Sequence, residues 1–125
     1  MKTNLIEIFQ SIRAVMQPYE TLGLNARLSS DTVYELWSER NVMIDGQKKN
    51  ELYFAGLKIL KNHVGFYFMP VHQTSEIKVV FHPSLFKLLK GLSCFQINKL
   101  DDALLEQIAD ALDKGFKIYK KNEWV

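Results

Sequence analysis

Two neighbouring apolar segments constrain the fold of this chain more than any other feature of its sequence. Leu52 to Leu60 and Val64 to Val71 are rich in aromatic and branched side chains, and only Lys61-Asn62-His63 separates them. Each segment has the length and composition of a strand, and each is far shorter than the roughly 20 residues that span a bilayer. Together they predict a β-hairpin at the centre of a sheet, buried on most of both faces.

Helical patterns lie at both ends of the chain. Apolar residues recur at three- and four-residue steps from Thr3 to Met16, and Pro18 should end that helix. Asp101 has the side chain of an N-cap residue for a long C-terminal helix. The stripe of that second helix that we expect to be buried comprises Leu105, Ile108, Ala109, Leu112 and Phe116.

Shorter elements are predicted between the terminal helices. The expected pieces are an irregular connection over Thr21 to Asp31, strands at Thr32 to Trp37, Val42 to Ile44 and Ser93 to Ile97, an extended piece at Ile77 to Phe81, and a short helix from Pro83 to Lys90. This order predicts an α+β fold, an antiparallel sheet of about five strands covered by N-terminal and C-terminal helices. We expect residues 1–125 to form one domain.

Composition and cysteine usage narrow the class of protein. The 125 residues are 47% hydrophobic and carry a net charge of only +2, without the long basic run of a nucleic-acid-binding arm. Cys94 is the only cysteine, and the N-terminal segment does not resemble a signal peptide. We therefore expect a cytoplasmic protein, a monomer or weak homodimer, with neither nucleic acid nor membrane as its partner.

Four carboxylates of the C-terminal helix form the first candidate site. Asp102, Glu106 and Asp110 follow one another at four-residue steps, and Asp113 lies three residues further on. Oxygen ligands on one helix face suit hard cations, so the pattern predicts weak binding of a metal such as ferrous iron. The alternative is the solvent-exposed face of an amphipathic helix.

Aromatic residues of the predicted central strands form the second candidate site. They are Trp37, Tyr53, Phe54, Phe66, Tyr67 and Phe68. Most should lie in the core, and a tyrosine is the residue expected to lie outside it. We therefore predict a ligand- or peptide-binding site built from Trp37, His63 and Tyr67.

No catalytic motif is present, but two residue types keep an enzyme among the alternatives. His63, His72 and His82 are dispersed and lack the four-residue spacing of a zinc hydrolase pair. Cys94 alternates with Phe95 in a predicted strand, which indicates a buried, inert thiol rather than a nucleophile. An enzyme would need His63 or Cys94 within hydrogen-bond reach of another polar group inside a cleft.

Several segments of the chain resemble a known family. They are Glu51 to Gly56, Lys61-Asn62-His63-Val64-Gly65 and its continuation to Pro70, Lys90 to Phe95, and the closing Leu-Asp-Asp helix. On these segments the chain from Tyr34 to Val125 resembles the YdhG-like family of small bacterial domains of unknown function. The resemblance implies a frataxin-like fold, with helices at both ends of an antiparallel sheet, and a role akin to that of an iron chaperone.

The resemblance also bears on where iron would bind. In frataxin-like proteins it implies an acidic ridge on the first helix and the neighbouring strand edge. Here the first helix offers only Glu7, with Glu20 beyond its end, so the C-terminal carboxylates would have to take that role. Our leading hypothesis is thus a non-enzymatic binding protein, and a ligand- or peptide-binding module on the aromatic sheet is the alternative.

Overall fold

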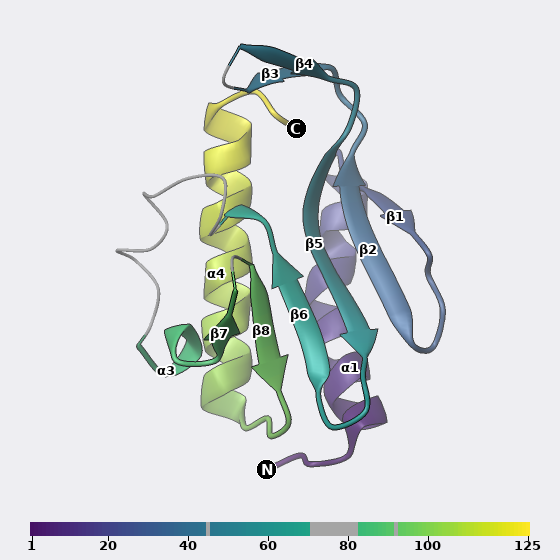
Figure 1. Ribbon diagram of the computed structural model, residues 1–125, viewed down its shortest axis with the longest axis vertical. Coiled ribbons are helices and arrows are strands. Elements are labelled where there is room, and N and C mark those ends of the chain that lie inside the picture. Colours follow the sequence, from purple (N-terminus) through teal and green to yellow (C-terminus); the bar gives the residue numbers. More distant parts are fainter. Residues whose placement is uncertain (45, 71–82, 92) are drawn as a thin grey trace.

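The computed structural model describes residues 1–44, 46–70, 83–91 and 93–125. These residues form two layers, an antiparallel sheet and a pair of helices, α1 and α4, on one of its faces (Figure 1). The six-stranded sheet has the order β1-β2-β5-β6-β8-β7. Its strands are β1 (Asn25–Arg27), β2 (Val33–Ser38), β5 (Leu52–Ile59), β6 (Val64–Phe68), β7 (Leu89–Lys90) and β8 (Cys94–Ile97). The predicted α+β fold is confirmed.

The central hairpin forms as the apolar segments predicted. β5 and β6 pair from Ala55 opposite Phe68 to Ile59 opposite Val64, with β2 and β8 on their outer sides. Phe54, Phe66 and Phe68 are fully buried beneath the helices. The hairpin is therefore the middle of both the sheet and the core.

Helix ends follow the capping rules. α1 (Leu5–Met16) begins after Asn4, whose side chain accepts hydrogen bonds from the backbone N–H groups of the first turn, so the helix starts two residues later than predicted. Pro18 ends it in a short 3₁₀ helix, η1 (Gln17–Thr21), rather than directly in a loop. At α4 (Asp102–Lys121) the Asp101 carboxylate accepts a 2.8 Å hydrogen bond from the Leu104 N–H, as predicted.

The buried face of α4 differs from the predicted stripe. Leu105, Ala109 and Phe116 are only partly buried, and the fully buried positions are Ile108, Ala111, Leu112, Gly115 and Tyr119. The reason is Gly115, where an added Cβ would lie 2.5 Å from Phe68 Cζ. The helix therefore approaches the sheet most closely along its glycine side.

Two short segments of the six-stranded sheet form strands that the sequence pattern did not predict. Asn25–Arg27, expected to be irregular, pairs with β2. The predicted helix from Pro83 to Lys90 is wrong beyond α3 (Pro83–Phe86), because Leu89 and Lys90 pair with β8. A four-residue helix gains few internal hydrogen bonds, so pairing at the sheet edge prevails.

The structure tests some of the remaining sequence predictions, and others concern residues that it does not describe. β3 (Val42–Ile44) and β4 (Gln47–Lys49) form a separate two-stranded ribbon, which extends the predicted short strand into a hairpin. The predicted extended piece at Ile77 to Phe81, His72 and His82 lie outside the described residues. Within the described ranges, no helix has the length and apolar character that crossing a membrane requires.

Candidate functional site

One face of the sheet carries no helix among the residues that the structure describes (Figure 1). Strand alternation determines which side chains lie on this helix-free face. On β2 the side chains of Tyr34, Leu36 and Ser38 are buried on the helix side, whereas Val33, Glu35 and Trp37 alternate with them and are half-buried. Tyr53 and Tyr67 are also half-buried, so the aromatic residues outside the core include the tyrosines, as predicted.

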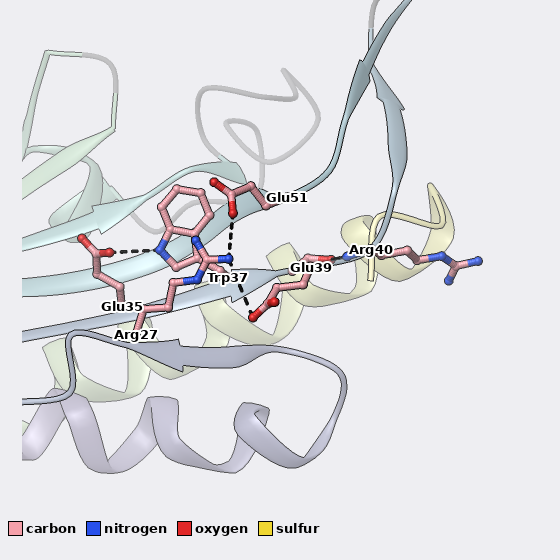
Figure 2. Close-up of polar contacts among 7 residues, drawn as sticks. Arg27, Glu35, Trp37, Glu39, Arg40 and Glu51 are labelled. Atoms are coloured by element: carbon pink, nitrogen blue, oxygen red, sulfur yellow. Dashed lines mark hydrogen bonds and ion pairs between the residues drawn. The ribbon is translucent and has the colours of Figure 1, made fainter.

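Trp37 is held between neighbours on both sides of its strand. Its ring stacks on Tyr53, with the centroids 4.8 Å apart and the planes 17° from parallel. From the neighbouring strand β1, Arg27 places its guanidinium carbon 4.6 Å from the Trp37 ring centroid. The indole Nε1 donates to Glu35 Oε1 at 3.0 Å (Figure 2). These contacts hold the Trp37 side chain in place, so its ring is not free to stack on a ligand.

Carboxylates surround the Arg27 guanidinium. Arg27 Nη2 lies 2.7 Å from Glu51 Oε2 and 3.7 Å from Glu39 Oε1 (Figure 2). The hydrogen bond to Glu51, together with both carboxylate charges, raises the pKa of Arg27 above its ordinary value. Glu35, beside Trp37, is a third carboxylate near the Arg27 guanidinium. The negative charges outnumber the positive one, and this excess favours the binding of a cation.

Two glycines let the tyrosine rings lie close to the sheet backbone. A Cβ added at Gly56 would overlap the Tyr53 hydroxyl, and one at Gly65 would lie 3.1 Å from Tyr67 Cε2. Gly56 is the register partner of Tyr67 on one side and of Glu35 on the other. The Tyr53 hydroxyl therefore lies near both Glu35 and the strand that carries Tyr67.

A small pocket opens next to these side chains. Its volume is about 230 Å³, and it is lined by Val33, Glu35, Tyr53, Leu57, Lys58 and Tyr67. We call it the sheet pocket. The Val33 side chain, one carboxylate, one ammonium group and two phenol groups thus converge from β2, β5 and β6.

Both phenols of the sheet pocket are neutral hydrogen-bonding groups. Burial raises the pKa of Tyr53 well above its ordinary value of about 10, and the nearby Glu35 carboxylate adds to the effect. Burial and a hydrogen bond with Cys94 also raise the pKa of Tyr67. Within the described part of the chain the Tyr53 hydroxyl has no hydrogen-bond partner and Lys58 has no ion-pair partner, so both are available to a ligand.

Cys94 adjoins the sheet pocket without being activated. Burial raises the pKa of its thiol, and the hydrogen bond from Tyr67 opposes this effect only in part. The thiol is half-buried rather than fully buried as predicted. Tyr67 cannot serve as its base, because a phenol with a raised pKa holds its proton at neutral pH.

His63 lies away from Cys94 and does not line the sheet pocket. It precedes β6, at the end where Val64 pairs with Ile97, whereas Tyr67 pairs with Cys94 at the other end. Tyr67 follows His63 by four residue steps along the strand, or about 13 Å at 3.3 Å per residue. A Cys94–His63 dyad is therefore not formed.

The structure brings together only part of the predicted ligand set. Tyr67 lines the sheet pocket, Trp37 contacts the pocket residue Tyr53 through a ring stack, and His63 is not a lining residue. Sequence reasoning missed Glu35 and Lys58. The signal for Glu35 was its position two residues before Trp37, which places both on one face of a strand.

The four predicted metal ligands lie along the exposed face of α4. Asp110 Oδ2 is 2.8 Å from Lys114 Nζ, and Asp113 Oδ2 is 2.9 Å from Lys117 Nζ. The described residues contain no group of three or more histidine, cysteine or acidic side chains that could hold a metal ion. Ferrous-iron binding by Asp102 and Glu106 together with these paired carboxylates stays a prediction.

A larger groove lies on the helical layer. It has a volume of about 450 Å³, between the end of α1, η1 and α4, and we call it the helix groove. Its lining comprises Val15, Pro18, Tyr19, Leu22, Asp113, Phe116, Lys117 and Lys120. Its floor is apolar, and two of its charged side chains, Asp113 and Lys117, already pair with each other.

Comparison with known proteins identifies no relative of this chain. No protein-family model, curated protein or solved structure matches the chain. The YdhG-like resemblance and the role it implies therefore stay predictions from the sequence segments alone.

Proposed function

We propose that this chain is a non-enzymatic binding module whose ligand site is the sheet pocket. The observation that carries the proposal is the convergence of Glu35, Lys58 and the unpartnered Tyr53 hydroxyl on one apolar concavity. A concave apolar surface with a few convergent polar groups is the general form of a small-molecule site. Polar groups that are not engaged within the protein can form hydrogen bonds and ion pairs with a ligand.

The size of the sheet pocket limits the ligand. Pockets for drug-sized molecules span about 300–1,000 Å³, and this one is smaller, at about 230 Å³. A small metabolite fits this volume better than a peptide does. The peptide-binding version of the hypothesis is therefore the less favoured one.

Rigid support for the lining side chains favours binding. Tyr53 lies on the central strand β5, stacks on Trp37, and has its backbone carbonyl fixed by a 2.8 Å hydrogen bond from the buried Tyr119 hydroxyl. Side chains that are already ordered lose little entropy when a ligand binds. The site is thus preorganised through contacts on both faces of the sheet.

The chemistry of the lining supports binding rather than catalysis. The two phenols hold their protons at neutral pH, and the neighbouring Cys94 thiol has a raised pKa. A nucleophilic cysteine requires the opposite setting.

A fragment screen followed by amide NMR tests this proposal. Hits are expected to shift the backbone signals of Val33, Tyr53 and Tyr67, and Val33→Trp, which fills the sheet pocket, should abolish these shifts. The matched control is Val15→Trp in the helix groove, which should leave the shifts unchanged. Hits that respond to Val15→Trp and ignore Val33→Trp would contradict the proposal.

A further inference from the structure

We infer that the ligand of the sheet pocket is a small zwitterion of the amino-acid class, with its ammonium group on Glu35 and its carboxylate on Lys58. The inference rests on the proposed function and adds the chemical identity of the ligand. It depends on the placement of two opposite charges that share one pocket and do not neutralise each other.

Glu35 provides the cation subsite. One of its carboxylate oxygens accepts from Trp37 Nε1 at 3.0 Å, which leaves the other oxygen for a ligand. The Tyr53 hydroxyl, whose oxygen can accept a second hydrogen bond from an ammonium group, lies in the same pocket. Glu39 and Glu51 both pair with the Arg27 guanidinium, so these three side chains together add one net negative charge on this side.

Lys58 provides the anion subsite. It follows Gly56 by two residues on β5 and lies between its register partners Val33 and Gly65. It forms no ion pair within the described ranges. An ammonium group on the rim of a pocket is a natural partner for a carboxylate.

The spacing of the two subsites suits groups that are close together in the ligand. Glu35 is opposite Gly56, so Lys58 is its diagonal neighbour on the same face of the sheet. Both side chains line the sheet pocket, so one small ligand can contact both charged groups. The ammonium and carboxylate groups of an α-amino acid, which are bonded to one carbon, fit between them.

The apolar lining completes the match. Val33 and the Tyr67 ring border the same space as the two charges. An aliphatic side chain of the ligand would bury its surface against them. Leucine is therefore a suitable probe, because its analogues that lack either charge are simple compounds.

The test compares leucine with 3-methylbutylamine, which lacks the carboxylate, and with 4-methylpentanoate, which lacks the ammonium group. Dissociation constants come from the chemical shifts of Tyr53 and Tyr67. Leucine is expected to bind at least about tenfold more tightly than either analogue, as the loss of one charge-assisted hydrogen bond implies.

Two variants separate the subsites. Glu35→Gln should weaken leucine and the amine at least about tenfold and leave 4-methylpentanoate unchanged. Lys58→Met should weaken leucine and 4-methylpentanoate and leave the amine unchanged. The controls Glu106→Gln on α4 and Lys61→Met in the hairpin turn remove the same charges at exposed positions outside the pocket and should change nothing.

The outcomes distinguish the inference from the proposed function. If uncharged fragments occupy the sheet pocket while leucine binds no better than its analogues, the zwitterion inference is overturned and the binding module stands. If neither leucine nor any fragment shifts the signals of the pocket, both fall. Equal effects of Glu35→Gln and Lys58→Met on all three probes would also overturn the inference, because the charges would then not act as separate subsites.

Discussion

The Tyr53 hydroxyl lies directly above Gly56, so that a methyl group at position 56 would occupy the space of the oxygen. We expect Gly56→Ala to displace the Tyr53 ring from Trp37 and to lower the free energy of unfolding by about 1–3 kcal/mol, as overpacking does. Urea unfolding measures this loss. In a Tyr53→Leu background the same substitution should cost much less, because the overlapping atoms are absent. An equal cost in both backgrounds would contradict the stated cause.

Gly115 marks the closest approach of α4 to the sheet. An added Cβ would lie 2.5 Å from Phe68 Cζ and 2.9 Å from Pro70 Cγ. Overpacking of about 1–3 kcal/mol should outweigh the gain in helix propensity of about 1 kcal/mol, so Gly115→Ala should destabilise the protein. The control Ala103→Gly, at an exposed position of α4, reports the propensity effect alone. A Gly115→Ala variant more stable than the wild type would show that α4 packs less closely than described.

Tyrosine ionisation should limit stability at high pH. Burial is the first cause of a raised pKa at all five tyrosines, Tyr19, Tyr34, Tyr53, Tyr67 and Tyr119. The unfolded chain releases these protons near pH 10, before the folded chain does, so stability is fully present below about pH 10 and falls above it. Phenolate absorbance should therefore rise together with the loss of the circular dichroism signal. Phenolate absorbance that is complete near pH 10 with the fold intact would contradict this.

The Tyr67 hydrogen bond should control the acidity of Cys94. Burial raises the pKa of the thiol, and the bond from Tyr67 lowers it in part. Tyr67→Phe is therefore expected to raise the pKa of Cys94 further and to slow its reaction with a disulfide reagent at about pH 8. The pH dependence of the reaction rate measures the pKa. An unchanged pKa would mean that the hydroxyl does not hydrogen-bond to the thiol in solution.

Which elements could be predicted from the sequence depended on the length of each pattern. The apolar segments at Leu52 to Leu60 and Val64 to Val71 are long enough to determine strand pairing, and the Asp101 cap marks the start of α4. Leu89–Lys90 has too few residues for a period to be visible. That short strand forms because it pairs with β8, and sequence patterns do not reveal this pairing.

The candidate site was less predictable because it depends on register. The pairing of β2 with β5 shifts between Leu36 and Trp37, and this irregularity decides which side chains meet across the two strands. Glu35 and Lys58 come together only in this register, and the roles of Gly56 and Gly65 follow from rings that lie over them. Sequence reasoning could place Tyr67 on a central strand but could not identify its neighbours.

The location of bound ligand tests the central claim most directly. Intermolecular nuclear Overhauser effects from leucine, or from the best fragment, to assigned aromatic ring protons give this location without any substitution. We expect contacts to the rings of Tyr53 and Tyr67, in the sheet pocket. Contacts to Tyr19 and Phe116 instead, which would place the ligand in the helix groove, would contradict it.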